Sequence, residues 1–297
     1  MSKERTFEGR THAVDAVAKH YDLTTDATHL VMGDHMHFGL FANQDDSLAK
    51  ATVGMVDFAV AGCGLGKHSH VLDVGCGSGS AAIYLHEKFG CRVTGISTSA
   101  RGIELARKNA VGRGDAFEFV VADALRTGLP AESCDMVFIM ETACHVRDLL
   151  ALMRESLRVL KPGGRLVITD PVARKDLAGH IAFMLMNGPR LVPMKFAWGP
   201  GIHMRNPGTY AMHCHQAGFR TVELIDLSEH VKPSMDRWEQ RALEVRDALM
   251  KTSEGRSTFR KFTTGSEHLR FVFEQGFFGH MLLRARKHQS PRAIPAL

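Results

Sequence analysis

The sequence lacks several features that would point to particular classes of protein. No apolar run approaches the roughly 20 residues that a membrane-spanning helix needs. The N-terminus has no apolar core of the kind found in a signal peptide. The net charge of +5 is spread along the chain without a lysine and arginine block, whereas nucleic-acid-binding proteins usually cluster their basic residues. We therefore predict a cytoplasmic protein with no membrane span and no nucleic-acid partner.

Cysteine pairs with metal-ligand or redox spacing are also missing. None of the six cysteines belongs to a C-x-x-C pair, and several fall in strands that look buried. We expect them to be reduced, small apolar residues rather than disulfides. The 297 residues suffice for one large domain, or for one domain with a substantial insertion.

Alternating strand-like and helix-like segments indicate an α/β fold. Amphipathic spacing predicts helices at about 11–20, 47–67, 99–111, 147–160 and 235–252. Apolar runs of strand length lie at 70–74, 91–96, 117–121, 136–140, 165–169, 219–227 and 279–286. This alternation predicts a doubly wound, mostly parallel sheet whose ligands bind beyond the carboxyl ends of the strands.

A glycine-rich turn after the first strand is the centre of the prediction. Residues 75–79 have the spacing G-x-G-x-G and are followed by a helix-like segment. The dinucleotide fingerprint is G-x-G-x-x-G, with an acid about 20 residues later for the ribose. Here 93–99 contains no acid, and Asp73 instead precedes Gly75 by two residues. An acid at that place suits a ligand that ends in a cationic amine.

Strand, acid, glycines and helix together resemble motif I of the class I S-adenosylmethionine (SAM) methyltransferases. The resemblance implies a seven-stranded, Rossmann-like methyltransferase sheet whose last strand is antiparallel. It also implies a cofactor site for SAM, in which Asp73 binds the amino group and Asp123 the adenine. The expected cofactor residues are Tyr21, Asp73, Gly75, Cys76, Gly77, Ser97, Thr98, Asp123, Ala124 and Met140.

A histidine-rich segment follows the first helix. Tyr21-Asp22 and the later His35-Met36-His37-Phe38-Gly39 resemble the N-terminal lid of the tocopherol, sterol and macrolide-sugar methyltransferases, although Leu40 stands where an aromatic residue is more usual. The resemblance implies that His35, His37 and Phe38 contact the acceptor. The two histidines are only two residues apart and have no nearby Cys/His pair with ligand spacing, so we predict no metal.

The strand and helix alternation stops between 171 and 217, where methionine and aromatic residues are frequent. Methionine adapts to irregular ligands, so we predict an acceptor-binding cap there, with Phe183 and Trp198 as further contacts; ordinary core under a helical insertion is the alternative. The predicted division is a helical lid at 1–66, a SAM-binding core at 67–170, the cap at 171–217, and C-terminal core strands with a helical insertion at 218–297.

The segment after the fourth strand resembles the Glu-Ser-x-x-His-x-x-Asp sequence of the same families, with Glu141 and His145 at the matching places. Imidazole accepts protons near neutral pH, which makes His145 the candidate general base. Asp170, at the tip of the next strand, is expected to orient His145 or share its role. The rebeccamycin-type sugar O-methyltransferases have a His and an Asp at matching positions. Helix packing is the simpler alternative for His145.

The function that we predict is SAM-dependent methylation of a small, partly apolar acceptor, with O-methylation in secondary-metabolite or antibiotic biosynthesis as first choice. C- or N-methylation of a prenyl, indole or other aromatic acceptor is the alternative within the class. A SAM-binding or cyclase-like scaffold and a nicotinamide oxidoreductase are alternatives from other classes. A homodimer is left open.

Overall fold

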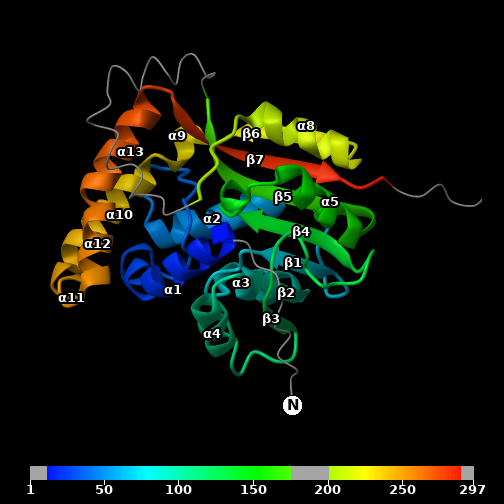
Figure 1. The fold of residues 1–297 in the computed structure, drawn as a ribbon, viewed down its shortest axis with the longest axis horizontal. Helices are drawn as coiled ribbons and strands as arrows, with labels where there is room; N and C mark the ends of the chain where they lie inside the picture. The colour runs from blue at the N-terminus through cyan, green and yellow to red at the C-terminus, as the bar shows by residue number, and fades with distance from the viewer. Residues whose placement is uncertain (1–11, 175–200, 289–297) are drawn as a thin grey trace, which may run out of the picture.

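A seven-stranded sheet with helices on both faces forms the body of the protein (Figure 1). The computed structural model describes residues 12–174 and 201–288. The strand order is β3-β2-β1-β4-β5-β7-β6, and only the pairings of β7 are antiparallel. The strands are β1 (His70–Val74), β2 (Arg92–Ser97), β3 (Phe117–Val121), β4 (Cys134–Met140), β5 (Leu160–Ala173), β6 (Val222–Asp226) and β7 (Phe278–Arg286). The predicted doubly wound methyltransferase-like sheet is confirmed.

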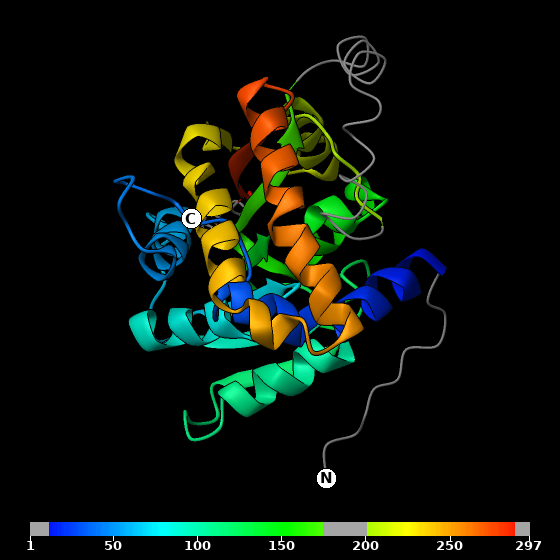
Figure 2. The same ribbon diagram turned by 90° about the vertical axis from the view of Figure 1, so that its left-hand side faces the viewer.

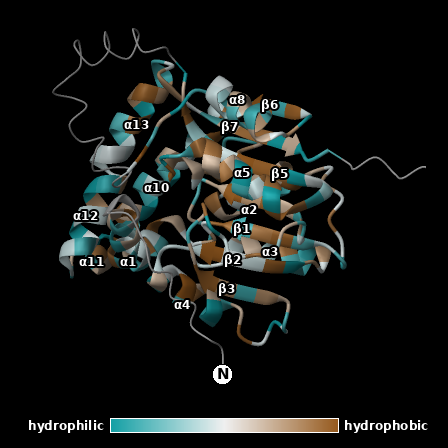
Figure 3. Cartoon of the chain, turned by 45° about the vertical axis from the view of Figure 1, so that its right-hand side comes forward, coloured by the Kyte–Doolittle hydropathy of each residue, from teal (hydrophilic) through white to brown (hydrophobic). Residues whose placement is uncertain are grey.

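Successive side chains of the central strands enter two separate cores, as the two-residue period of a strand requires. Met136 and Phe138 of β4 face one core, while Val137 and Ile139 face the other. The first core is covered by α2 (Leu48–Val60), α3 (Ser80–Phe89), α4 (Ala100–Asn109) and a C-terminal group of helices. The second is covered by α5 (Leu149–Val159) and α8 (Pro207–Ala217). Figure 3 shows the apolar residues gathered on the strands between these layers.

The C-terminal group of helices packs beside the N-terminal helix α1 (His12–Met32), although α1 ends at Met32 and the group begins only at Ser228 (Figure 2). It consists of α9 (Ser228–Val231), α10 (Pro233–Glu244), α11 (Arg246–Leu249), α12 (Ser253–Phe262) and α13 (Thr264–Glu274). The prediction of one helix over 235–252 was wrong, because α10 ends at Glu244. The two helices after 252 were missed, although the Thr252 side chain caps α12 by accepting from the Gly255 N–H.

The predicted division into lid, core and cap stays a prediction, and most of the cap lies outside the described residues. Its last part is α8, which packs on α5 and on the strands β6 and β7. This helix therefore belongs to the layer that covers the sheet. Within the described ranges, no helix is both long enough and apolar enough to cross a bilayer.

Candidate functional site

A cavity of about 990 Å³ lies at the carboxyl ends of the parallel strands, where a doubly wound sheet places its ligand. β1, β2 and β4 lead into it, α1 forms one wall, and the segment 34–37 forms another. Every residue predicted to contact the cofactor lines this cavity: Tyr21, Asp73, Gly75, Cys76, Gly77, Ser97, Thr98, Asp123, Ala124 and Met140. Sequence reasoning therefore brought together positions that the fold also brings together.

The glycine loop lies against the cavity in a conformation that side chains resist. Gly75 and Gly77 have φ angles of +80° and +52°, in the left-handed region. A Cβ at Gly75 would lie 2.0 Å from Oγ1 of Thr142, whereas a Cβ at Gly77 would meet only the end of Met36 at 3.3 Å. Gly75 is therefore required by the packing of the protein, while Gly77 leaves bare main chain beside the cavity.

Asp73 is a buried carboxyl group that lacks a full set of partners. The side chain is 2% exposed, and its Oδ2 atom accepts no hydrogen bond from any described residue. Burial raises the pKa of Asp73 to about 7, because the charged form loses its hydration. A cationic group entering the cavity would satisfy this oxygen and favour the ionised form.

Asp123 has a structural role as well as a place in the cavity wall. Its Oδ1 accepts from the Leu125 N–H at 2.9 Å, which stabilises the turn after β3. Turn capping, the simpler function of such a residue, is therefore present. On the neighbouring strand, Ser97 and Thr98 line the cavity.

The α1 wall of the cavity is formed by Val17, Tyr21 and Thr25, which follow one another at four-residue spacing on one helix face. The Tyr21 hydroxyl lies 2.9 Å from Nε2 of His145, and the two rings meet edge to face. His145 ends the short 3₁₀ helix η1 (Ala143–His145) after β4. Burial raises the pKa of Tyr21, so its hydroxyl stays neutral. The pair joins residues 124 positions apart, which no local sequence pattern reveals.

Glu141 occupies a strained position at the end of β4. Its φ of +49° is in the left-handed region, which costs a non-glycine residue about 1–2 kcal/mol. Its Oε1 atom accepts from the Phe38 N–H at 2.7 Å and from Nε2 of His280 at 3.1 Å. This carboxylate thus joins the segment after α1, the end of β4 and the last strand. Sequence reasoning missed His280, which sits in the apolar first part of β7.

Two histidines of the segment 34–37 line the cavity, as predicted, and burial lowers the pKa of both, that of His35 to about 4. Nδ1 of His37 lies 2.8 Å from the Phe38 carbonyl oxygen, which can only accept, so Nδ1 carries the proton. Nε2 of His37 is consequently a buried acceptor, and no described residue donates to it.

The prediction that Phe38 contacts the acceptor was wrong. Phe38 is 1% exposed, does not line the cavity, and packs on Trp238 and Phe273 at ring-centroid distances of 4.6 and 6.0 Å. It anchors the segment 34–37 to the C-terminal helices, because a buried aromatic ring contributes a large apolar area. The predicted contacts Phe183 and Trp198 lie outside the described residues.

Asp170, predicted to orient His145 or to share its role, does not line the cavity. Asp170 is fully buried outside the cavity lining, and its Oδ2 accepts from the Tyr210 hydroxyl on α8. Burial raises the pKa of Asp170 to about 8. Tyr21 lies against the imidazole of His145.

The cavity is also lined by residues that sequence reasoning did not single out. Apolar side chains of Val146, Leu149 and Leu150 line it together with the basic residues Arg147, His203, Arg205 and His213. Arg205 donates to the main-chain carbonyls of Val146 and Arg147, each at 2.7 Å, and thereby holds the loop after η1. No cluster of side chains suited to a metal ion occurs among the described residues.

Comparison with known proteins identifies the class of this site. A family of methyltransferase domains matches residues 72–168. The chain is 28% identical over 274 residues to the 27-O-demethylrifamycin SV methyltransferase of Amycolatopsis mediterranei. The aligned residues cover 91% of this chain and 96% of the relative. It is 31% identical over 222 residues to the methyltransferase GfsG of Streptomyces halstedii, which covers 73% of this chain and 77% of the relative.

Solved structures show the same fold at lower sequence identity. The mycolic acid cyclopropane synthase CmaA1, solved with S-adenosylhomocysteine, superposes with a TM-score of 0.81 at 18% identity over 95% of this chain and all of the other. The [4+2]-cyclase SpnF superposes with a TM-score of 0.77 at 22% identity over 92% of this chain and 96% of the other. One fold thus carries several chemistries.

Proposed function

Because the chain belongs to the SAM-dependent methyltransferases, we propose that it transfers the methyl group of SAM to a hydroxyl group of a small, partly apolar acceptor in secondary-metabolite biosynthesis. The observation that carries this proposal is the pairing of His145 with Tyr21 on the cavity wall, at 2.9 Å. This pair places a proton acceptor beside the glycine loop, and among the common methyl acceptors a hydroxyl group has most need of one.

The residues of the cavity fit the cofactor. Asp73 has an unsatisfied buried oxygen for a cationic amino group, and the main chain at Gly77 leaves room for the attached chain. Asp123, Ser97 and Thr98 line the part of the cavity on the β2 and β3 side and would hold the nucleoside. SAM supplies an activated methyl group on a sulfonium, so the protein's contribution is largely to position the acceptor and to take up its proton.

His145 would take up the proton of the acceptor hydroxyl. An imidazole must be neutral to do so, with one nitrogen holding a hydrogen and the other a lone pair. The neutral Tyr21 hydroxyl at Nε2 fixes the ring orientation and, with it, the tautomer of the imidazole. Tyr21 is therefore assigned to positioning, and His145 to general-base catalysis.

The acceptor side of the cavity combines apolar and polar contacts. Val146, Leu149 and Leu150 supply apolar surface, and His37 offers a buried lone pair to a hydroxyl donor. These features suit a molecule with an apolar framework and more than one hydroxyl group. The name of the Amycolatopsis relative, an O-methyltransferase by its description, supports the same reading.

The experiment that tests the proposal is a transfer assay with methyl-deuterated SAM and panels of hydroxylated, amine and alkene natural products. Mass spectrometry would find the product that gains the labelled methyl, and NMR would locate the methyl on oxygen. A methyl on nitrogen or carbon would overturn O-methylation. In the carbon case Glu141 becomes the residue to test as the proton acceptor.

A further inference from the structure

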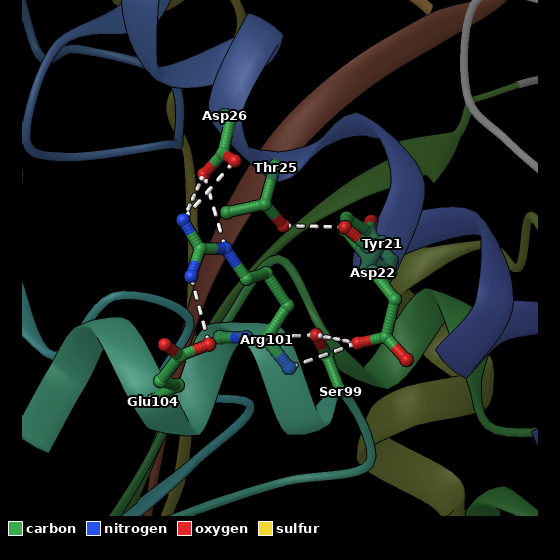
Figure 4. Close-up of polar contacts among 8 residues, drawn as sticks. Tyr21, Asp22, Thr25, Asp26, Ser99, Arg101 and Glu104 are labelled. Atoms are coloured by element: carbon green, nitrogen blue, oxygen red, sulfur yellow. Dashed lines mark hydrogen bonds and ion pairs between the residues drawn. The ribbon is translucent and has the colours of Figure 1, made fainter.

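The α1 wall of the cofactor cavity is joined to the N-terminal end of α4 by charged contacts. Tyr21 and Thr25 point into the cavity, and Asp22 and Asp26 occupy the adjoining face of the same helix. Both carboxylates reach the first turn of α4, whose residues Ser99 and Gly102 themselves line the cavity (Figure 4). The contacts therefore connect two walls of one site.

Asp22 binds the N-terminus of α4 directly. Its Oδ1 accepts from the Ser99 hydroxyl at 2.6 Å and from the Arg101 N–H at 3.0 Å. Ser99 is also the N-cap of α4 and accepts from the Gly102 N–H. A carboxylate at a helix N-terminus is favoured by the unpaired N–H groups and by the helix dipole. Asp22 thus adds a charged cap, supplied by another helix, to a capping arrangement that is already complete.

Asp26 makes a second connection, through the Arg101 side chain. Nη2 of Arg101 lies 3.0 and 3.1 Å from the two oxygens of Asp26, and Nε lies 3.3 Å from Oδ1. The other edge of the guanidinium binds Glu104 at 2.7 Å within α4. Exposed ion pairs contribute little singly, but a forked arginine in a network holds a fixed geometry.

The rest of α1 shows why these contacts matter for position. At its C-terminal end Val31 and Met32 are buried in the core, and the helix ends at Gly33, whose φ is +78°. Between residues 15 and 26, by contrast, only Ala18 and Thr25 are buried. Few buried side chains therefore hold the cavity-lining half of α1, so its polar contacts with α4 add to the packing of α1 on α12 and α10.

We propose that Asp22, Asp26 and Arg101 are positioning residues that set how long the cofactor stays bound, by holding α1 against α4 across the cofactor cavity. The inference depends on SAM as the cofactor and is independent of the proposed acceptor. Loosening the cluster would let the Tyr21 and Thr25 wall move away from the ligand. The expected consequence is faster release of the cofactor with little change in the fold.

The test is the dissociation rate of S-adenosylhomocysteine, measured by surface plasmon resonance on the full chain. Asp26→Asn and Glu104→Gln form a matched pair, because each removes one exposed carboxylate from the same arginine. Of these two carboxylates, only that of Asp26 joins α1 to α4. We expect Asp26→Asn to raise the dissociation rate about threefold to tenfold and Asp22→Asn about tenfold or more, while Glu104→Gln stays within about twofold.

Salt and thermal melting separate positioning from general destabilisation. Raising ionic strength from about 0.05 to about 0.5 M should speed the release of S-adenosylhomocysteine from the unaltered protein. The effect should be smaller in the double variant that combines Asp22→Asn with Asp26→Asn, because it has lost the charges that salt screens. Melting temperatures of Asp26→Asn and Glu104→Gln without ligand should agree. Equal release rates for Asp26→Asn and the unaltered protein would overturn the proposal, as would equal acceleration by Glu104→Gln.

Discussion

At the scale of single residues, the protonation state of Asp73 is expected to be coupled to the binding of a cation in the cavity. The ligand-free carboxyl has a pKa raised to about 7 by burial, so it is largely protonated below that pH. Binding a cationic amino group requires the ionised form. We expect SAM affinity to fall by up to about tenfold for each pH unit below 7, because the carboxyl group must then release a proton on binding.

Isothermal calorimetry between pH 5.5 and 8.5, in buffers of different ionisation enthalpy, measures both the affinity and the released proton. Asp73→Asn keeps the shape of the side chain and is expected to bind SAM at least tenfold more weakly, with a flat pH profile. An unchanged affinity in this variant would remove Asp73 from the cofactor site.

His145 and Tyr21 are expected to differ in the size of their effects. His145→Ala should lower turnover about 10²–10⁴-fold, the usual range for a lost general base, and leave SAM affinity nearly unchanged. Tyr21→Phe keeps the ring and removes the hydroxyl that holds Nε2, so we expect a smaller loss of about tenfold. Steady-state kinetics with the identified acceptor, together with calorimetry for SAM, measure both quantities. Near-normal turnover in His145→Ala would show that proton removal is not assisted by this residue.

At the scale of elements, two glycines of the same loop are expected to have different roles, Gly75 in folding and Gly77 in SAM binding. Gly75→Ala places a methyl group on the Thr142 side chain and should destabilise the fold by about 2–4 kcal/mol. Gly77→Ala meets only the flexible end of Met36, so its cost should be near the 1–2 kcal/mol of a left-handed side chain. Its SAM affinity should nevertheless fall by about tenfold or more. Urea denaturation and calorimetry on both variants measure the contrast, and the reverse order would contradict it.

The strands could be predicted from sequence because each carries its own signal. β1, β3 and β4 are apolar runs bounded by turn residues, and Asp73, Asp123 and Glu141 follow from their place at or near strand ends. The helices α11 to α13 were not predicted, because their apolar positions pack on one another and on α1 and because the cap at Thr252 was overlooked. The existence and order of the strands could therefore be predicted, whereas the number and bounds of the helices in the C-terminal group could not.

The polar partners within the site could not be predicted, for a related reason. Tyr21 with His145, and Glu141 with His280, join elements 124 and 139 residues apart. Strand-end reasoning gives the edge of the sheet at which a residue lies, but not the direction of its side chain. Asp170 shows the difference. It lies on β5 directly after Thr169, which pairs with Met140, so it is at the same edge of the sheet as Glu141; yet its side chain points into the core toward Tyr210.

At the scale of the whole molecule, the buried Asp170 makes stability depend on pH. Its pKa is about 8 in the folded protein and near 4 when exposed on unfolding, so unfolding releases a proton between these values. Stability should therefore fall as pH rises from about 4 to 8, because the unfolded state binds fewer protons. Asp73 acts in the same direction in the ligand-free protein.

Asp170→Asn retains an acceptor for the Tyr210 hydroxyl and removes the titration. We expect its stability relative to the unaltered protein to increase as pH rises from 5 to 8, by up to about 1.4 kcal/mol per pH unit. Because Asp73 is present in both proteins, its contribution cancels. Thermal and urea unfolding across this pH range give the comparison, and a pH-independent difference would contradict a buried titrating carboxyl.

The position of β7 between β5 and β6 has a consequence for the order of events during synthesis. β6 pairs only with β7 within the described sheet, and His280 of β7 is one of the two groups that hold Glu141 at the end of β4. A ribosome delivers these last strand residues after every other part of the cavity wall. A site in which His280 holds Glu141 can therefore form only after residues 278–286 have emerged, whatever pairing β1 to β5 reach earlier.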